Sequence, residues 1–257
     1  MRPDSLPATV APEEYPWLGP AARSAVLTAG GIVDLEPNTM TATDRPLVDR
    51  GAIERALAAE GAAPLAERTL VLAVGSNQTP ATIARKYARS GADIPVTTPS
   101  VRCTVENLAV GHVASSAAPG YVPAAPYRAV GERLELVATW FDAEQLAVVD
   151  RTEPNYDRVR LRAEDFPVVL ATGERPAYVD VYASHRGVLA REGVPIPLRH
   201  RQQELFDELL VLTGDQRLRG DAAAICALLA EETELLRELA CTHGLIADDG
   251  IPRPATS

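Results

Sequence analysis

The sequence has little cysteine and no long hydrophobic run. Its 257 residues include three cysteines, Cys103, Cys226 and Cys241. Three cysteines cannot all pair, and one predicted helix would hold the last two about 22 Å apart at 1.5 Å per residue. We therefore expect each to be a buried, reduced thiol and not part of a structural disulfide.

Segments that would direct the chain to or across a membrane are also lacking. No stretch approaches the roughly 20 apolar residues that span a bilayer. Residues 1–20 are rich in proline, carry Asp4, Glu13 and Glu14, and lack the apolar segment of a secretory signal. These features predict a cytoplasmic protein that does not associate with membranes.

Basic side chains are few compared with acidic ones. The chain has 25 Lys and Arg against 35 Asp and Glu, and its formal net charge is -10 at pH 7. Nucleic acids and anionic membrane surfaces need a basic footprint, so neither is an expected partner. Lys86 is the only lysine beside 24 arginines, which together with abundant alanine indicates a bacterial genome of high GC content.

Histidine is scarce too, and its spacing is uninformative for metals. The four histidines are His112, His185, His200 and His243, and none of their spacings is typical of a zinc site. We expect no metal and no other cofactor. His112 lies on a predicted strand, where it would be either a core residue or part of a pocket.

What is present is an ordinary globular composition, with 46% hydrophobic and 23% charged residues. The pattern divides the chain into an N-terminal extension over 1–66, a strand-rich domain over 67–190 and a C-terminal helical extension over 191–257. We expect Trp17 to anchor the N-terminal lead onto the core. The expected helices cover 49–60, 80–90, 198–213 and 221–243, and the expected strands include 70–74, 133–141 and 177–183.

The last predicted helix carries one apolar stripe that needs a partner surface. The stripe could dock on the central domain or on a second subunit, so a homodimer stays open. Its members recur at helical spacing and are Ile225, Leu228, Leu229, Leu235, Leu236 and Leu239.

Residues 70–77 are the most informative stretch, because an apolar strand leads into a Gly-Ser-Asn turn and then into a helix start. Gly75 permits a backbone turn that other residues disfavour. Thr79 and Pro80 form an N-cap followed by proline at the first helical position. Backbone N–H groups of Ser76 and Asn77 would then lie near a helix N-terminus, which suits a carboxylate or phosphate. A plain chain reversal is the alternative interpretation.

A second segment, residues 146–161, makes a family resemblance visible when it is taken together with residues 70–77. Together they resemble the γ-glutamylcyclotransferase-like family. The first family motif, a strand ending in Tyr-Gly-Ser-Asn, is matched by Val74, Gly75, Ser76 and Asn77, with valine in place of tyrosine. The second, Leu-Asp-x-x-Glu followed by a tyrosine and an arginine, is matched by Val149, Asp150, Glu153, Tyr156 and Arg158.

The resemblance covers about residues 68–185 and includes two segments between the motifs. The stretch that begins at Gly120 resembles the family's Gly-x-Pro-Ala-Thr strand, and the stretch that begins at Glu135 resembles the strand before the glutamate helix. This sequence departs from the family pattern after the glutamate, where Pro154 stands in place of a glycine. The resemblance implies an α+β fold, with a small mixed β-barrel and flanking helices, to which a C-terminal helical pair is added here.

The chemistry that the resemblance implies is cleavage of a γ-glutamyl amide by intramolecular cyclisation, an acyl transfer of the transferase or lyase type. The products are 5-oxoproline and a free amine. The substrate's own α-amino group is the nucleophile, so no cofactor is required. Glu153 would move the protons. The turn from Val74 to Asn77 would hold the substrate's carboxylate or the developing oxyanion, and Tyr156 would line the pocket.

Other interpretations of these residues stay open. Glu153 could be a solvated carboxylate at a helix end, and Arg158 and Arg160 fit strand-surface charges better than substrate clamps. Ser76 lacks the sequence context of a serine nucleophile. For the whole protein, the alternatives are a non-catalytic small-anion binding or assembly protein of the same fold, and an amidohydrolase that uses water.

Overall fold

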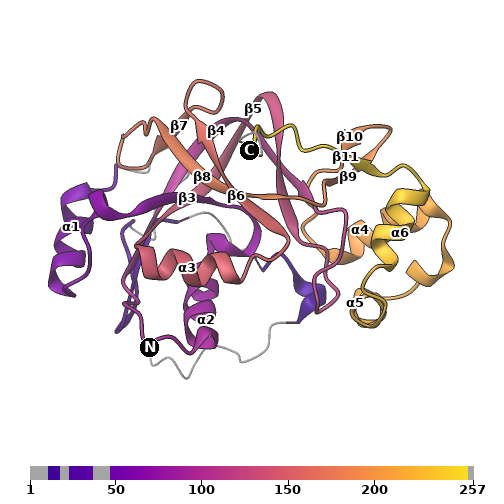
Figure 1. The fold of residues 1–257 in the computed structure, drawn as a ribbon, viewed down its shortest axis with the longest axis horizontal. Helices are drawn as coiled ribbons and strands as arrows, with labels where there is room; N and C mark the ends of the chain where they lie inside the picture. The colour runs from indigo at the N-terminus through magenta and orange to yellow at the C-terminus, as the bar shows by residue number, and fades with distance from the viewer. Residues whose placement is uncertain (1–10, 18–22, 37–46, 254–257) are drawn as a thin grey trace.

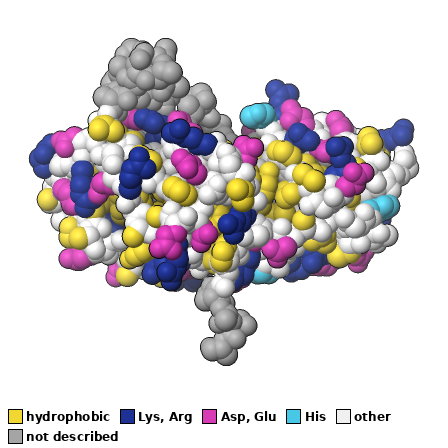
Figure 2. Space-filling model, turned by 90° about the horizontal axis from the view of Figure 1, so that it is seen from above, with side chains coloured by type: hydrophobic (Ala, Val, Ile, Leu, Met, Phe, Trp, Pro, Cys, Tyr) yellow, Lys and Arg dark blue, Asp and Glu magenta, His cyan; other side chains and the backbone are white. Residues whose placement is uncertain are grey.

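The computed structural model describes residues 11–17, 23–36 and 47–253 and has an α+β fold (Figure 1). Asp4 and the other residues of the lead before residue 11 lie outside the described part. None of the described helices is long and apolar enough to cross a membrane. On the face shown in Figure 2, acidic and basic side chains are interspersed.

A mixed sheet forms the centre of the molecule, with the strand order β2-β1-β4-β5-β3-β8-β6 and with β7 paired to β4. β3 and β8 are parallel, and the other pairs of this sheet are antiparallel. The strands are β1 (Ala25–Thr28), β2 (Gly31–Asp34), β3 (Thr69–Ala73), β4 (Thr98–His112), β5 (Ala124–Phe141), β6 (Tyr156–Arg162), β7 (Val168–Leu170) and β8 (Tyr178–Ser184).

This sheet confirms the predicted α+β class. Among the described strands no pairing joins β2 to β6, so closure into a barrel stays a prediction. The hairpin of β1 and β2 pairs with β4, so part of the N-terminal extension belongs to the same sheet as the central region. A second, small sheet has the order β10-β9-β11 and contains β9 (Val188–Arg191), β10 (Val194–Pro195) and β11 (Ile246–Ala247).

The helices occupy separate places around the sheet (Figure 1). α2 packs beside α3, and α4, α5 and α6 gather at one end of the molecule. The helices are α1 (Arg50–Ala59), α2 (Pro80–Ser90), α3 (Ala143–Arg151), α4 (Gln202–Thr213), α5 (Ala222–Glu231) and α6 (Leu235–Thr242). Short 3-10 turns are η2 (Pro12–Glu14), η3 (Leu65–Glu67), η4 (Gly75–Gln78) and η5 (Gln216–Leu218).

The ends of α2 follow the signals in the sequence. The Thr79 hydroxyl accepts a hydrogen bond from the Thr82 N–H at 3.4 Å, and Pro80 is the first helical residue. Gly91 ends the helix in the left-handed conformation, at φ 65°. These ends fix where α2 starts relative to the turn that precedes it.

The predicted helix over 221–243 is wrong in one respect, because it consists of two helices. α5 ends at Glu231 and α6 begins at Leu235, with Glu232 in a non-helical conformation at φ -103° and ψ 71°. In one continuous helix Glu232 would share the face of Ile225 and Leu229, seven and three residues earlier, and would enter the core. The break leaves residues 231–234 exposed instead.

The break also changes the expectation for the cysteines. Cys226 and Cys241 now lie in different helices, and all three cysteines are free thiols. Cys103 and Cys226 are buried as expected, whereas Cys241 is exposed on α6. Burial raises the pKa of both the Cys103 and the Cys226 thiol to about 12, so these two are protonated at neutral pH.

The described residues form two large hydrophobic cores and two smaller ones. One large core lies between the sheet and α1. The other joins the C-terminal helices to the central region through residues such as Val122 and Leu189, and it buries the apolar stripe. The stripe therefore packs within its own chain. The stripe residues in this core are Ile225, Leu229, Leu235, Leu236 and Leu239, with Leu228 partly buried beside them.

Candidate functional site

The turn after β3 is a single 3-10 turn that leads directly into α2. Val74 precedes it in an extended conformation, and Gly75 opens it with a positive φ of 57°. A Cβ on Gly75 would collide with the Tyr15 hydroxyl and would lie 2.9 Å from the Ala124 Cβ. Glycine is thus required here both by the backbone angle and by the lack of space.

Glu153 lies just past the end of α3, where the chain turns into β6. Its N–H donates to the Asp150 carbonyl at 3.1 Å, and its carbonyl accepts from the Tyr156 N–H at 3.0 Å. The Glu153 side chain is only 13% exposed, so it is not the solvated carboxylate of a free helix end.

The structure brings Glu153 and Asn77 together although they are 76 residues apart. The Asn77 Nδ2 donates to Glu153 Oε1 at 2.8 Å. The two family-like motifs therefore meet through a direct hydrogen bond between their polar side chains.

Lys86, which the sequence reasoning did not select, completes the cluster. Its Nζ lies 2.5 Å from the same Oε1 of Glu153, and its side chain is 16% exposed. α2 carries Lys86 to this point about two turns from the helix start. One feature of the sequence points to Lys86: it is the sole lysine in a chain that otherwise uses arginine.

The Asn77 amide leaves one acceptor unused at the site. An ionised carboxylate only accepts hydrogen bonds, so Asn77 must turn its NH₂ group toward Glu153. Its Oδ1 is buried and has no donor among the described residues. A buried acceptor without a donor is costly, which makes it a place where an N–H or ammonium group of a ligand would bind.

Two tyrosines form hydrogen bonds with the backbone of Ala124 at the start of β5. The Ala124 N–H donates to the Tyr15 hydroxyl at 2.8 Å, and the Tyr156 hydroxyl donates to the Ala124 carbonyl at 2.9 Å. Burial raises the pKa of Tyr156 well above its usual value, and the neighbouring Tyr15 and the Glu153 charge raise it further. Tyr156 is therefore a neutral phenol beside Glu153.

An ionic network fixes the end of α3 against the sheet. Asp150 accepts from the Arg158 Nε at 3.0 Å and from the Tyr182 hydroxyl at 2.6 Å. The buried Asp180 accepts from the Arg158 Nη1 at 2.6 Å and from the Arg160 Nε at 3.2 Å. Arg158 and Arg160 thus pair with carboxylates of the sheet and helix, and they orient the segment that carries Glu153.

The remaining residues of interest lie around or away from this cluster. Val74 packs against the main core, and the Ser76 carbonyl accepts from the Thr79 N–H at 3.1 Å. His112 is a core residue, since it is fully buried and its Nε2 accepts from the Arg199 N–H at 2.9 Å. In the described parts of the chain, no group of His, Cys, Asp and Glu side chains is arranged to hold a metal ion.

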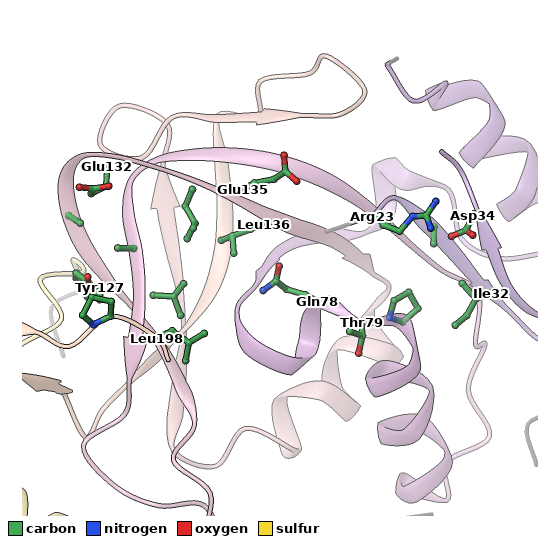
Figure 3. Close-up of a pocket in the computed structure, with 17 residues that line it drawn as sticks. Arg23, Ile32, Asp34, Gln78, Thr79, Tyr127, Glu132, Glu135, Leu136 and Leu198 are labelled. Carbon is green, nitrogen blue, oxygen red and sulfur yellow. The ribbon is translucent and has the colours of Figure 1, made fainter. Parts of the chain in front are cut away.

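A cavity of about 820 Å³ opens beside the turn (Figure 3). Gln78 and Thr79 line it, but Asn77, Lys86 and Glu153 do not. Most of the residues that line the cavity are apolar. Figure 3 shows Tyr127, Glu132 and Leu198 on one side of the cavity and Arg23, Ile32 and Asp34 on the other. The candidate site is thus defined by the polar contacts of Glu153 and is separate from this opening.

Comparison with known proteins finds a distant likeness of fold. A solved γ-glutamyl cyclotransferase matches with 12% identity and a TM-score of 0.38, over 74% of this chain and 94% of that chain. An uncharacterised human protein matches with 12% identity and a TM-score of 0.36 over the same shares. An Arabidopsis thaliana protein matches with 18% identity and a TM-score of 0.33, over 46% of this chain and 70% of that one. No family model and no curated protein matches the sequence.

Proposed function

We propose that this protein is an enzyme that cleaves a γ-glutamyl amide, or a related amide, by intramolecular cyclisation. The observation that carries the proposal is the position of Glu153, whose nearly buried carboxylate accepts hydrogen bonds from Asn77 of the first motif and from Lys86. The substrate would be a small molecule, and the reaction needs no cofactor because the substrate brings its own nucleophile. The cytoplasm stays the expected location.

Glu153 is the proton carrier in this proposal. Its carboxylate takes a proton from the substrate's α-ammonium group, and the freed amine attacks the γ-carbonyl carbon. As the bond from that carbon to the leaving nitrogen breaks, Glu153 returns the proton to the leaving amine. The ring nitrogen loses its second proton to solvent, so the products are the neutral lactam and the free amine. Proton transfer of this kind typically contributes about 10²- to 10⁴-fold in rate. Closure of a five-membered ring adds the advantage of a well-oriented intramolecular reaction.

The neighbours of Glu153 have matching roles. The unused Oδ1 of Asn77 would accept a hydrogen bond from the substrate's ammonium group, next to the carboxylate that removes its proton. The positive charge of Lys86 would attract the substrate's α-carboxylate while its contact with Oε1 orients Glu153. The backbone N–H groups of the Gly75–Gln78 turn would stabilise charge on the reacting carbonyl oxygen.

The test is a screen of γ-glutamyl amino acids and γ-glutamylamines for release of 5-oxoproline. Each compound is paired with its N-acetyl derivative, whose blocked amine cannot cyclise. The proposal expects equal amounts of 5-oxoproline and amine from the free compounds and none from the blocked ones. Release of glutamate that carries oxygen from labelled water would indicate an amidohydrolase. Ligand binding without turnover would indicate a binding protein.

A further inference from the structure

The N-terminal segment 11–17 reaches into the candidate site, although the family-like motifs begin more than fifty residues later. Its Tyr15 is buried, and the Tyr15 hydroxyl accepts the Ala124 N–H at 2.8 Å. The same hydroxyl sits against Gly75, where any Cβ would collide with it. Tyr15 therefore lies on the turn that also carries Asn77.

Aromatic stacking holds Tyr15 in this place. Its ring stacks on Tyr121 with centroids 4.4 Å apart and an interplanar angle of 17°. Trp17 packs edge-on against both rings, at 5.0 Å and 5.1 Å, and its indole N–H donates to the Ala11 carbonyl at 2.9 Å. The preceding turn, η2, packs against α5 (Figure 1). The C-terminal helices thus support the segment that delivers Tyr15.

The Tyr15 hydroxyl has a hydrogen that none of its neighbours uses. Its oxygen accepts from the Ala124 N–H and is also approached by the Ser76 N–H, and no hydrogen bond among the described residues has the Tyr15 hydroxyl as its donor. The nearby Ala124 carbonyl accepts from Tyr156. Burial raises the pKa of Tyr15 far above its usual value, and the Tyr121 hydroxyl and the Glu153 carboxylate raise it further. The group is therefore a neutral O–H donor at physiological pH.

We propose that Tyr15 is a substrate-contacting residue, whose hydroxyl donates a hydrogen bond to an oxygen of the γ-glutamyl group held at the Gly75–Gln78 turn. This inference rests on the proposed function. The aromatic side chain that position 74 lacks is then supplied from the N-terminal extension. The site is built from three parts of the chain: the N-terminal segment, the turn with α2, and the end of α3.

The test compares Tyr15→Phe with Tyr178→Phe in the full-length protein. Tyr15→Phe keeps the stacked ring and removes only the hydroxyl. Tyr178→Phe is the control, because it removes the hydroxyl of an exposed tyrosine on β8. We expect kcat/KM for the best γ-glutamyl substrate to fall about 10-fold or more in Tyr15→Phe, because one hydrogen bond to a charged oxygen is lost, and to stay near wild type in Tyr178→Phe.

Thermal unfolding shows whether each variant is folded at the assay temperature. A folded Tyr15→Phe protein with wild-type kcat/KM would overturn the role of Tyr15, while loss of activity in Glu153→Gln would leave the proposed function standing. A Tyr15→Ala protein that is more active than wild type would show that Tyr15 obstructs the site, and would also overturn the proposal.

If the wild-type protein turns over no γ-glutamyl compound, binding decides the matter separately. The probes are 5-oxoproline and L-glutamate, titrated while the fluorescence of Trp17 is followed, with Trp17→Phe as the control for the signal. Binding that weakens about 10-fold or more in Tyr15→Phe supports the contact. Equal affinity in both proteins, or no binding of either probe, contradicts it.

Discussion

At the scale of single residues, the one lysine of the chain forms an ion pair with Glu153. Arginine serves as the basic residue everywhere else in this sequence, so we expect lysine at position 86 to meet a local requirement of the site. An ammonium group is a compact charge, whereas a guanidinium is a wide planar fork with different donor directions. Lys86 Nζ and Asn77 Nδ2 both contact Oε1 of Glu153, an arrangement that suits a compact donor.

We therefore expect replacement of Lys86 to impair the proposed activity. We expect Lys86→Met to lower kcat/KM about 10-fold or more, because Glu153 loses a charged partner worth about 1.5–3 kcal/mol. Lys86→Arg should restore only part of the activity. Steady-state kinetics on the best substrate measures both. Arg175→Met, at an exposed position between β7 and β8, is the control, and an equal loss there would deny Lys86 a specific role.

Gly75 allows a second prediction at this scale, with Gly91 as its control. Both glycines have a positive φ, but a Cβ on Gly91 would meet no atom within 4 Å, whereas one on Gly75 would collide with Tyr15. Gly91→Ala should cost about 1 kcal/mol of unfolding free energy. Gly75→Ala should cost at least 1 kcal/mol more than that, of the order seen for overpacking. Urea denaturation measures both, and equal losses would show that Tyr15 does not press on the turn.

The residues that could be predicted from the sequence are those that lie in local motifs. Asn77 and Glu153 stood out because each follows a recognisable strand or helix, and the structure joins them. Lys86 and Tyr15 could not be found in this way, because their relation to Glu153 depends on how α2 packs and where the N-terminal segment folds back. No local pattern encodes those distances.

At the scale of elements, the ends of α2 and the position of α3 determine the site. Thr79, Pro80 and Gly91 mark both ends of α2 in the sequence itself, because caps are local signals. α3 is held differently, through the bonds of Asp150 with Arg158 and Tyr182 from the neighbouring strands. Asp150 and Arg158 belong to the same motif as Glu153, so the motif contains both the candidate proton carrier and its supports.

The C-terminal helices show where local signals fail. Their apolar spacing predicted the buried stripe correctly, since Leu229 and Leu236 are core residues. The same spacing did not predict the break at Glu232, which depends on the core excluding a charged side chain. Helical periodicity thus identified which residues are buried but not how many helices carry them.

Because this stripe is buried, a substitution that creates a cavity in it should lower the stability of the protein. Leu229→Ala should lower the free energy of unfolding by about 2–5 kcal/mol, because Leu229 is 0% exposed. Val211→Ala on α4 is the control, and because Val211 is 82% exposed the change should stay within about 0.5 kcal/mol. Since the stripe packs within its own chain, the loss should not depend on protein concentration. A loss that shrinks on dilution would indicate a second subunit on this surface.

At the scale of the whole molecule, the fold joins a mixed sheet to a helical cluster, and His112 lies between them. It is on β4 and accepts a hydrogen bond from Arg199, just before α4. Burial lowers the pKa of His112 to about 3, and the Val122 carbonyl offsets this only in part. The folded protein therefore keeps His112 neutral where the unfolded chain would already be protonated.

The buried, neutral His112 predicts that the stability of the folded protein falls as the pH is lowered. Below the unfolded pKa of about 6.5, only the unfolded chain binds the proton, so this contribution to stability falls by up to about 1.4 kcal/mol for each pH unit toward pH 3. Urea denaturation between about pH 6.5 and 5 measures the slope, above most carboxylate titrations. His112→Gln should flatten it. An unchanged slope in that variant would assign the acid sensitivity to other groups.

The fold class could be predicted from the sequence, but the long-range contacts between segments could not. The family resemblance implied an α+β fold, and the structure has one. That β1 and β2 join the central sheet, and that the 11–17 segment crosses to the site, are long-range contacts between segments with ordinary local sequences. They place the N-terminal extension next to the proposed chemistry.

The central claim is that Glu153 transfers the proton in a cyclisation, and Glu153→Gln tests it most directly. Glutamine keeps the shape and can still contact Lys86 and Asn77, but it cannot act as a base. With the best γ-glutamyl amide, we expect a folded Glu153→Gln protein to retain similar KM and to lose kcat for 5-oxoproline release by about 10² or more. A folded Glu153→Gln protein that retains most of the wild-type kcat would contradict the account.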